Sequence, residues 1–394
     1  MRYFFSIFCF CLLSQVLSCQ EQPTQQNPED GLLWKAPISS QLTEGEFPKF
    51  LYNNAIIAHA TRRGDNVLVA LNKNSGKELW TWSDKLDGHG IRTKEVHQYN
   101  NILVWRYAGR IYGINLNNGQ TLWKERVIPQ RGAWFGSDWV SGLGEAIMFN
   151  TGDKEYFSGY TSKGNFHQYP TFPVRAREET YASTTLLLNA PPYRIDTVAL
   201  NDTLALLPFA TFKEIGFVLF NFTRNKEIYT TTIPGDTSGI FSMPPILHQD
   251  KIFFAAGTLI HAYDFKTGKL LWKERFPSFM SGSGIIYHDG MIIGNCEDTF
   301  MYALDAKTGK QLWATKTSGT SSRLFEMNGV IYFTGGGDGL LHAVDAKTGK
   351  HIWKKESPDL QRNSGASFFD SVTGADGKIY VSSYLSLFCY KAAR

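Results

Sequence analysis

The chain has 394 residues, of which 43% are hydrophobic and 19% are charged, and its formal net charge is +4. With 40 basic and 36 acidic residues and no basic stripe, nucleic acid is excluded as an expected partner. The 36 Gly, 28 Phe and 18 Tyr favour turn-rich strands over helices, so the predicted class is all-β.

The chain begins with the pattern of a secretory signal, residues 1–18. One basic residue precedes an apolar run that is too short to cross a bilayer as a helix. The sequence Val16-Leu17-Ser18-Cys19 resembles the bacterial lipobox, in which the Cys becomes the lipidated N-terminus after cleavage. We therefore expect a signal peptide, a lipid anchor at Cys19 and a flexible tether over residues 19–30. The alternative is an ordinary signal peptide with a chance Cys.

Lipidation would hold the body of the protein at a membrane surface. The residue after the anchor is Gln20, not the Asp that favours inner-membrane retention in some bacteria. The expected location is therefore the cell envelope, at the outer membrane and facing the periplasm.

One repeated segment organises residues 31–394. Its strongest copies run Ile260–Trp272, Met301–Trp313 and Leu341–Trp353, each with Ala-x-Asp-x-Lys-Thr-Gly-Lys-x-x-Trp inside. Each copy predicts a strand, a turn headed by Asp with Gly at positive φ, and a second strand at the aromatic. A further apolar run precedes each turn, so a repeat supplies the four strands of a propeller blade. Weaker copies end at Trp80 and Trp123, and decayed copies at Phe166 and Tyr229.

The spacing of the aromatic positions predicts eight blades. From Trp34 onward they recur at intervals of 40 to 46 residues, except for 63 residues between Phe166 and Tyr229. The last repeat stops at Arg394, where its aromatic strand should begin, and residues 31–34 have that strand's character. We predict that this N-terminal strand completes the last blade and closes the ring.

The Ala-x-Asp-x-x-Thr-Gly-x-x-x-Trp segments resemble the tryptophan-docking repeats of the PQQ-like (quinoprotein) family of eight-bladed propellers. The resemblance covers nearly the whole chain after the signal. It implies that the Trp of one blade packs flat against the neighbouring blade. The tryptophans that it makes structural are Trp80, Trp123, Trp272, Trp313 and Trp353.

The family has two relevant branches. Its dehydrogenases hold PQQ and calcium beside an adjacent Cys-Cys disulfide, but this chain has no Cys-Cys pair and no Cys-x-x-Cys-His for haem. The BamB-like branch consists of lipoproteins that dock on the outer-membrane β-barrel assembly factor, and it shares the lipobox, the tether and a single propeller.

The branch comparison predicts a non-enzymatic, monomeric scaffold with no catalytic residue, metal or cofactor. Its expected partner is an envelope protein such as a β-barrel assembly factor. The alternatives are a PQQ- and calcium-dependent quinoprotein enzyme and a propeller that binds a glycan or another small ligand.

Two segments carry the candidates for partner binding. Residues 131–139 combine three aromatics with an Arg, a composition typical of interaction hot spots. The long interval 167–228 is predicted to be an excursion between blades, and such loops often carry binding. The alternatives are aromatics that cover the core and a decayed blade with a packed loop. The candidate residues are Trp134, Phe135, Trp139, Arg175, Arg177, Leu187, Tyr193 and Arg194.

Other chemistry-bearing residues are assigned structural roles. His261 and His342 stand at a repeat position that is Tyr in other copies, which indicates packing. The run Gly335–Gly339 is expected to be a strand-to-strand turn rather than a phosphate cradle, because no helix follows it. Cys296 and Cys389 lie two blades apart in the count, so two buried free thiols are predicted.

Overall fold

The structure is a computed structural model in which every regular element is a β-strand among the residues it describes. No helix in those residues is long and apolar enough to span a membrane. The described residues are 25–27, 30–38, 49–63, 65–84, 96–107, 110–126, 139–143, 146–150, 156–161, 166–170, 186–189, 203–210, 215–221, 224, 226–233, 245–280, 284–319, 321–360 and 366–394.

The strands of these residues pair into eight sheets. Each sheet consists of strands that are consecutive in the chain, except that the two strands nearest the N-terminus each join one of the last two sheets. The first four sheets contain β3 (Phe50–Tyr52), β4 (Ala55–Arg62), β5 (Asp65–Asn72) and β6 (Glu78–Trp82); β7 (Val96–Tyr99), β8 (Ile102–Tyr107), β9 (Arg110–Asn115) and β10 (Thr121–Arg126); β11 (Trp139–Leu143), β12 (Ala146–Asn150), β13 (Tyr156–Thr161) and β14 (Phe166–Pro170); and β15 (Leu186–Asn189), β16 (Thr203–Ala210), β17 (Ile215–Asn221) and β18 (Lys226–Ile233).

The other four contain β19 (Ile246–His248), β20 (Lys251–Ala256), β21 (Leu259–Asp264) and β22 (Leu270–Arg275); β23 (Ile285–His288), β24 (Met291–Asn295), β25 (Phe300–Asp305) and β26 (Gln311–Lys316); β27 (Phe325–Met327), β28 (Val330–Thr334), β29 (Leu341–Asp345) and β30 (His351–Lys355) with β1 (Gln25–Gln26); and β31 (Thr373–Ala375), β32 (Lys378–Ser382) and β33 (Ser386–Lys391) with β2 (Leu32–Pro37).

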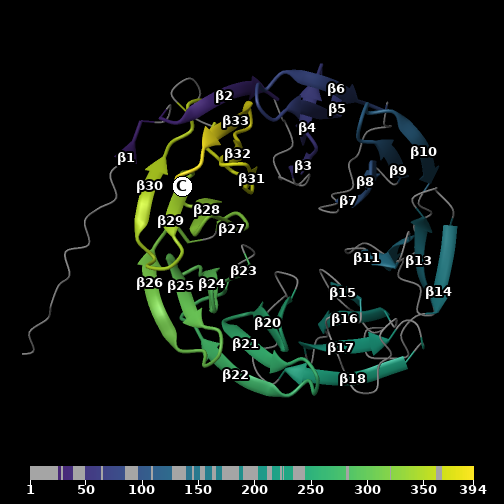
Figure 1. Cartoon of the computed structure of the whole chain (residues 1–394), viewed down its shortest axis with the longest axis vertical. Helices are drawn as coiled ribbons and strands as arrows, with labels where there is room; N and C mark the ends of the chain where they lie inside the picture. The colour runs from purple at the N-terminus through teal and green to yellow at the C-terminus, as the bar shows by residue number, and fades with distance from the viewer. Residues whose placement is uncertain are drawn as a thin grey trace, which may run out of the picture.

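The sheets stand side by side in a ring, with strands such as β3, β23 and β27 toward the centre and β10, β18 and β26 at the rim (Figure 1). Within the ring, inner strands of neighbouring sheets contact each other, including β31 and β3. The fold is therefore an all-β propeller, as the repeats predicted.

The predicted turn of the repeat is present in the three strongest copies. The Oδ1 atom of Asp305 accepts hydrogen bonds from the backbone N–H and the hydroxyl of Thr308, both at 2.7 Å. Gly309 follows at a φ of 75°, and its N–H donates to the Asp305 carbonyl at 2.8 Å. Asp264 and Asp345 bind Thr267 and Thr348 in the same way.

The outer aromatic of each of several sheets packs on the turn glycine of the next sheet. A Cβ atom added to Gly309 would lie 2.8 Å from the Trp272 ring, whose Nε1 donates to the Ala306 carbonyl at 3.2 Å. This contact confirms for Trp80, Trp272 and Trp313 the tryptophan docking that the family resemblance implied, whereas Trp123 packs on Gly113 of its own sheet. The other pairs with this contact are Trp34 with Gly76, Trp80 with Gly119, Tyr229 with Gly268, and Trp313 with Gly349.

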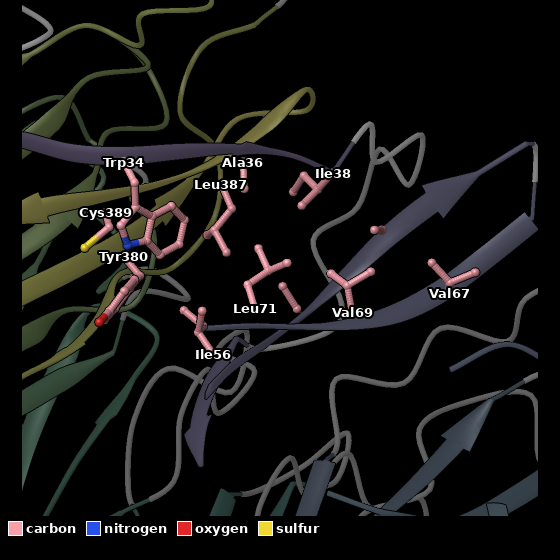
Figure 2. Close-up of a cluster of buried hydrophobic side chains, with 12 residues drawn as sticks. Trp34, Ala36, Ile38, Ile56, Val67, Val69, Leu71, Tyr380, Leu387 and Cys389 are labelled. Carbon is pink, nitrogen blue, oxygen red and sulfur yellow. The ribbon is translucent and has the colours of Figure 1, made fainter. Parts of the chain in front are cut away.

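The strand nearest the predicted tether, β2, pairs antiparallel with β33 near the C-terminus, with Lys35 opposite Phe388. Trp34 then shares a buried cluster with Tyr380 and Cys389 of its own sheet and with side chains of β5 such as Leu71 (Figure 2). The segments β2 and β33, from near the two ends of the chain, are thus held in one sheet by backbone pairing and by the burial of apolar side chains. Within the predicted tether, β1 also pairs, in parallel, with the rim strand β30.

Candidate functional site

A cavity of about 460 Å³ opens where the sheet β27–β30 meets the sheet β31–β33. One wall is the turn between β28 and β29, and the other walls come from the connections that precede β27 and β31 and from the β32–β33 turn. The lining residues are Ser321, Ser322, Thr334, Gly335, Gly336, Gly337, Asp338, Gly339, Ser367, Phe368, Phe369 and Tyr384.

The glycine-rich wall is a strand-to-strand turn, as predicted. The N–H of Gly335 donates to the Leu340 carbonyl, and the N–H of Gly339 donates back to the Gly335 carbonyl. A Cβ atom on Gly337 would lie 2.7 Å from the Ser318 carbonyl oxygen, and one on Gly339 would lie 2.6 Å from the Cβ of Ser367. Only glycine fits at these two positions, because backbone or side chain approaches too closely.

Asp338 is the single charged side chain among the described residues that line the cavity. Its carboxylate is 30% exposed and lies 3.1 Å from Nε2 of His342, which is fully buried. Burial lowers the pKa of His342, so the ring is neutral. Burial alone would raise the pKa of Asp338, but the hydrogen bonds from His342 and from the Leu340 N–H hold it below its usual value. The carboxylate is therefore ionised.

The preceding sheet contains the same pairing. In its turn, the Tyr302 hydroxyl donates to the Asp298 carboxylate, which also accepts the Phe300 N–H at 2.9 Å. The Asp338 carboxylate accepts the Leu340 N–H at 3.1 Å in the same manner. An acidic residue and a ring four positions later therefore brace the turn in both sheets, which supports the prediction that His342 is a packing residue.

The remaining lining is aromatic and hydroxylic. The rings of Phe369 and Tyr384 stack at 4.0 Å with an interplanar angle of 5°. Beside them lie the hydroxyls of serines 321, 322 and 367. The Oγ atom of Ser318 lies 2.2 Å from the place that a Cβ on Gly335 would take, and within the described part of the chain it is buried without a hydrogen-bond partner. Such a wall can hold a small polar molecule.

Two ion pairs, one buried and one partly exposed, support the segments around the cavity. The Nζ of Lys49 lies 2.6 Å from the Asp370 carboxylate, with exposed side-chain fractions of 2% and 12%. Lys35 pairs with Asp359, which also accepts the Ser383 hydroxyl at 2.6 Å. Both pairs join residues near the N-terminus to the last part of the chain, and they neutralise two carboxylates close to the cavity.

The described residues do not fit a calcium and PQQ site. Among them, no group of three His, Cys, Asp or Glu side chains is placed to hold a metal ion, and the cavity offers one carboxylate where calcium takes six to eight oxygen ligands. The expectation of a chain without cofactors nevertheless stays a prediction. Cys296 and Cys389 are both buried free thiols, which confirms the prediction of two buried free thiols.

Only two of the predicted partner-binding residues are in described positions, and both lie in strands. Strands β15, β16 and β17 of one sheet lie within 167–228, as the decayed-blade alternative predicted. Trp139 begins strand β11, and Leu187 lies in strand β15 because the apolar triplet Leu186–Leu188 pairs with β16. The two strands contact each other. Outside the described residues lie Cys19, Trp134, Phe135, Arg175, Arg177, Tyr193 and Arg194.

Sequence reasoning missed the cavity. Its one visible signal was the Gly335–Gly339 run, which was assigned to the turn alone. Phe369 and Tyr384 gave no signal, because each lies in a connection without a repeat motif.

The known proteins that resemble this chain share one fold but differ in activity. The sequence profile of a family described as outer membrane protein assembly factor BamB matches residues 21–138 and 222–394. Tetrathionate hydrolase of Acidithiobacillus ferrooxidans is 25% identical over 263 residues, which are 62% of this chain and 48% of that protein. The chain thus spans about half the length of this curated relative.

Among solved structures, BamB from Moraxella catarrhalis superposes with a TM-score of 0.59 and 14% identity, over 92% of this chain and 99% of that one. Quinohemoprotein alcohol dehydrogenase from Comamonas testosteroni superposes with a TM-score of 0.64 and 12% identity, over 92% and 76%. Propellers of this type therefore occur in an assembly factor and in enzymes.

Proposed function

Because the chain belongs to the family of the outer membrane protein assembly factor BamB, we propose that it is a lipid-anchored propeller scaffold that binds a protein partner at the cell envelope. The observation that carries this proposal is the extent of the family match, which includes both the first and the last repeats. The partner proposed is a β-barrel assembly factor, in a periplasm-facing complex at the outer membrane.

The scaffold proposed is one closed ring of eight blades over residues 31–394. The pairing of β2 with β33 supports the closure, because it gives the last three-stranded group its fourth strand. The Trp34 contact with Gly76 supports it further, since this docks the last blade on the first as in the other blade pairs. A ring of blades packed against one another, with short and protected edges, is a rigid support for loops.

Partner binding is proposed for the region around β11 and β15. These inner strands are neighbours, and the candidate residues Trp134, Arg177 and Tyr193 lie close to them in sequence. Aromatic and Arg side chains in one region have the composition of an interaction hot spot.

The membrane anchor is proposed at Cys19, after removal of residues 1–18. Gln25 is held at the rim strand β30, and a chain from Cys19 to Gln25 extends at most about 20 Å. The lipid would therefore keep the rim near β30 close to the membrane. A Cys19→Ala variant should move the protein from the membrane to the soluble envelope fraction, whereas retention on the membrane at high salt would contradict the anchor.

The test of the scaffold is affinity purification of the lipidated protein from gently solubilised envelopes, with mass spectrometry of the proteins that co-purify. Trp134→Ala and Arg177→Ala should each reduce recovery of the partner. Leu312→Ala is the matched control, because Leu312 is an exposed apolar residue on the distant strand β26. Recovery of no envelope protein, or equal recovery from all variants, would argue against the proposal.

A second candidate function is enzymatic turnover of a small molecule. It is favoured by the similarity to tetrathionate hydrolase. Turnover of tetrathionate by the purified protein would support this candidate over the scaffold.

A further inference from the structure

The charge of the groups that line the cavity restricts which ligands it can bind. Among the residues that the structure describes, the one charged group lining it is the ionised carboxylate of Asp338, and none of these lining residues is Lys, Arg or His. The nearby Lys49 is already paired with Asp370. An anion would meet a like charge without a cation to offset it, and a metal ion would find a single carboxylate. A neutral molecule that donates hydrogen bonds fits this charge pattern.

The polar groups of the cavity are suited to hydroxyl partners. The hydroxyls of Ser321 and Ser322 already donate to the carbonyls of Ser322 and Arg323, so toward a ligand their oxygens act as acceptors. The Asp338 carboxylate likewise accepts more hydrogen bonds than the turn uses here. The Asp338 carboxylate accepts hydrogen bonds from the Leu340 N–H and from His342, and its side chain remains partly exposed toward the cavity. Several hydroxyls on one ligand would be satisfied together.

The aromatic pair supplies the apolar side of the same site. Phe369 and Tyr384 come from different connections and stack in parallel, so each ring is held by the other. A pre-formed aromatic surface beside a few fixed polar groups is the usual composition of a small-molecule site. The volume of about 460 Å³ lies within the range of such sites.

The preceding sheet shows what distinguishes this turn. There the residues before Asp298 are Cys296 and Glu297, whereas the residues before Asp338 are glycines. Cys296 is fully buried and fills its turn. The glycine turn keeps the bracing pair and carries no side chain at positions 336 and 337.

We propose that this cavity binds a small neutral polyhydroxylated molecule, a mono- or disaccharide, with its hydroxyls on Asp338 and the serines and an apolar ring face on Phe369 or Tyr384. The proposal goes beyond the scaffold function and does not depend on it, because the cavity lies between other sheets than β11 and β15.

The experiment is calorimetric titration of the purified propeller, supported by saturation-transfer NMR, with glucose, N-acetylglucosamine, maltose, sucrose and trehalose as probes. Inorganic phosphate and calcium are the charged comparators. We expect saturable binding of at least one sugar and none of either ion. Phe369→Ala and Tyr384→Ala should each weaken that binding by about tenfold, as loss of one good contact does.

Tyr287→Ala is the matched control, because Tyr287 also stacks in parallel, on His248 at 3.7 Å, between two other sheets. It should leave sugar binding unchanged. Phe369→Leu keeps much of the apolar volume but removes the aromatic ring, and it is the variant to test if an Ala variant fails to fold. Absence of binding by every sugar at millimolar concentration, equal binding by wild type and both cavity variants, or binding of phosphate or calcium instead would each overturn the proposal.

Discussion

Two glycines allow the tryptophan docking to be measured separately from backbone strain. Gly290 and Gly309 both have positive φ, 79° and 75°. A Cβ on Gly290 would meet nothing within 4 Å, whereas one on Gly309 would lie 2.8 Å from the Trp272 ring. Both Ala variants incur the strain of a left-handed residue, about 1–2 kcal/mol. Only Gly309→Ala must also displace the ring.

The displacement adds overpacking of about 1–3 kcal/mol, and it strains the hydrogen bond from Trp272 Nε1 to the Ala306 carbonyl, a bond that contributes about 1 kcal/mol. We expect the free energy of unfolding to fall by about 1–2 kcal/mol in Gly290→Ala and by about 3–5 kcal/mol in Gly309→Ala. Urea titration at constant m-value measures both.

A double variant sharpens this test. In a Trp272→Ala background the ring is absent, so Gly309→Ala should cost only what Gly290→Ala costs. Equal losses for Gly290→Ala and Gly309→Ala in the wild-type background would refute the docking argument.

Three further predictions concern buried polar groups. Lys49→Met leaves the Asp370 carboxylate buried and unpaired, and urea titration should show a loss of about 3–5 kcal/mol; a loss below about 1 kcal/mol would contradict a buried pair. Burial, with the nearby Lys273 charge, lowers the pKa of His261 to about 4. As the pH falls from about 6.5 toward 4, His261 is therefore protonated in the unfolded chain before it is protonated in the folded protein. The free energy of unfolding declines in that window. His261→Phe should reduce the decline by up to about 3 kcal/mol, and unchanged pH profiles of thermal unfolding would argue against the assignment. Burial raises the pKa of Cys389 to about 12, so Cys389 and Cys296 should react with a thiol reagent only at the rate of unfolding, and rapid reaction of the folded protein would contradict their burial.

The repeats could be interpreted from the sequence because their information is local. Asp305, Thr308 and Gly309 form a turn by hydrogen bonds within five residues, and the Trp spacing then follows the blades. The pairing of β2 with β33 was also predictable, since residues 31–34 had the character of the strand that the last repeat lacked.

The cavity could not be predicted because it depends on contacts between distant segments. Phe369 and Tyr384 meet only after two connections fold over the same turn. Lys49 and Asp370 pair across 321 positions, and no periodic pattern marks either residue. The strand β15 was missed for a related reason: Leu186–Leu188 is too short an apolar run to be distinguished from a loop segment by sequence alone.

The scaffold proposal is tested most directly by site-specific photocrosslinking in living cells. A photoreactive residue at position 134 or 177 should crosslink the lipidated protein to a β-barrel assembly factor, while the same residue at position 312, on the rim strand β26, should not. Crosslinks to that factor that are lost on competition with unlabelled protein would establish a specific surface. Absence of any envelope-protein crosslink from positions 134 and 177, with the protein folded and membrane-bound, would contradict the account.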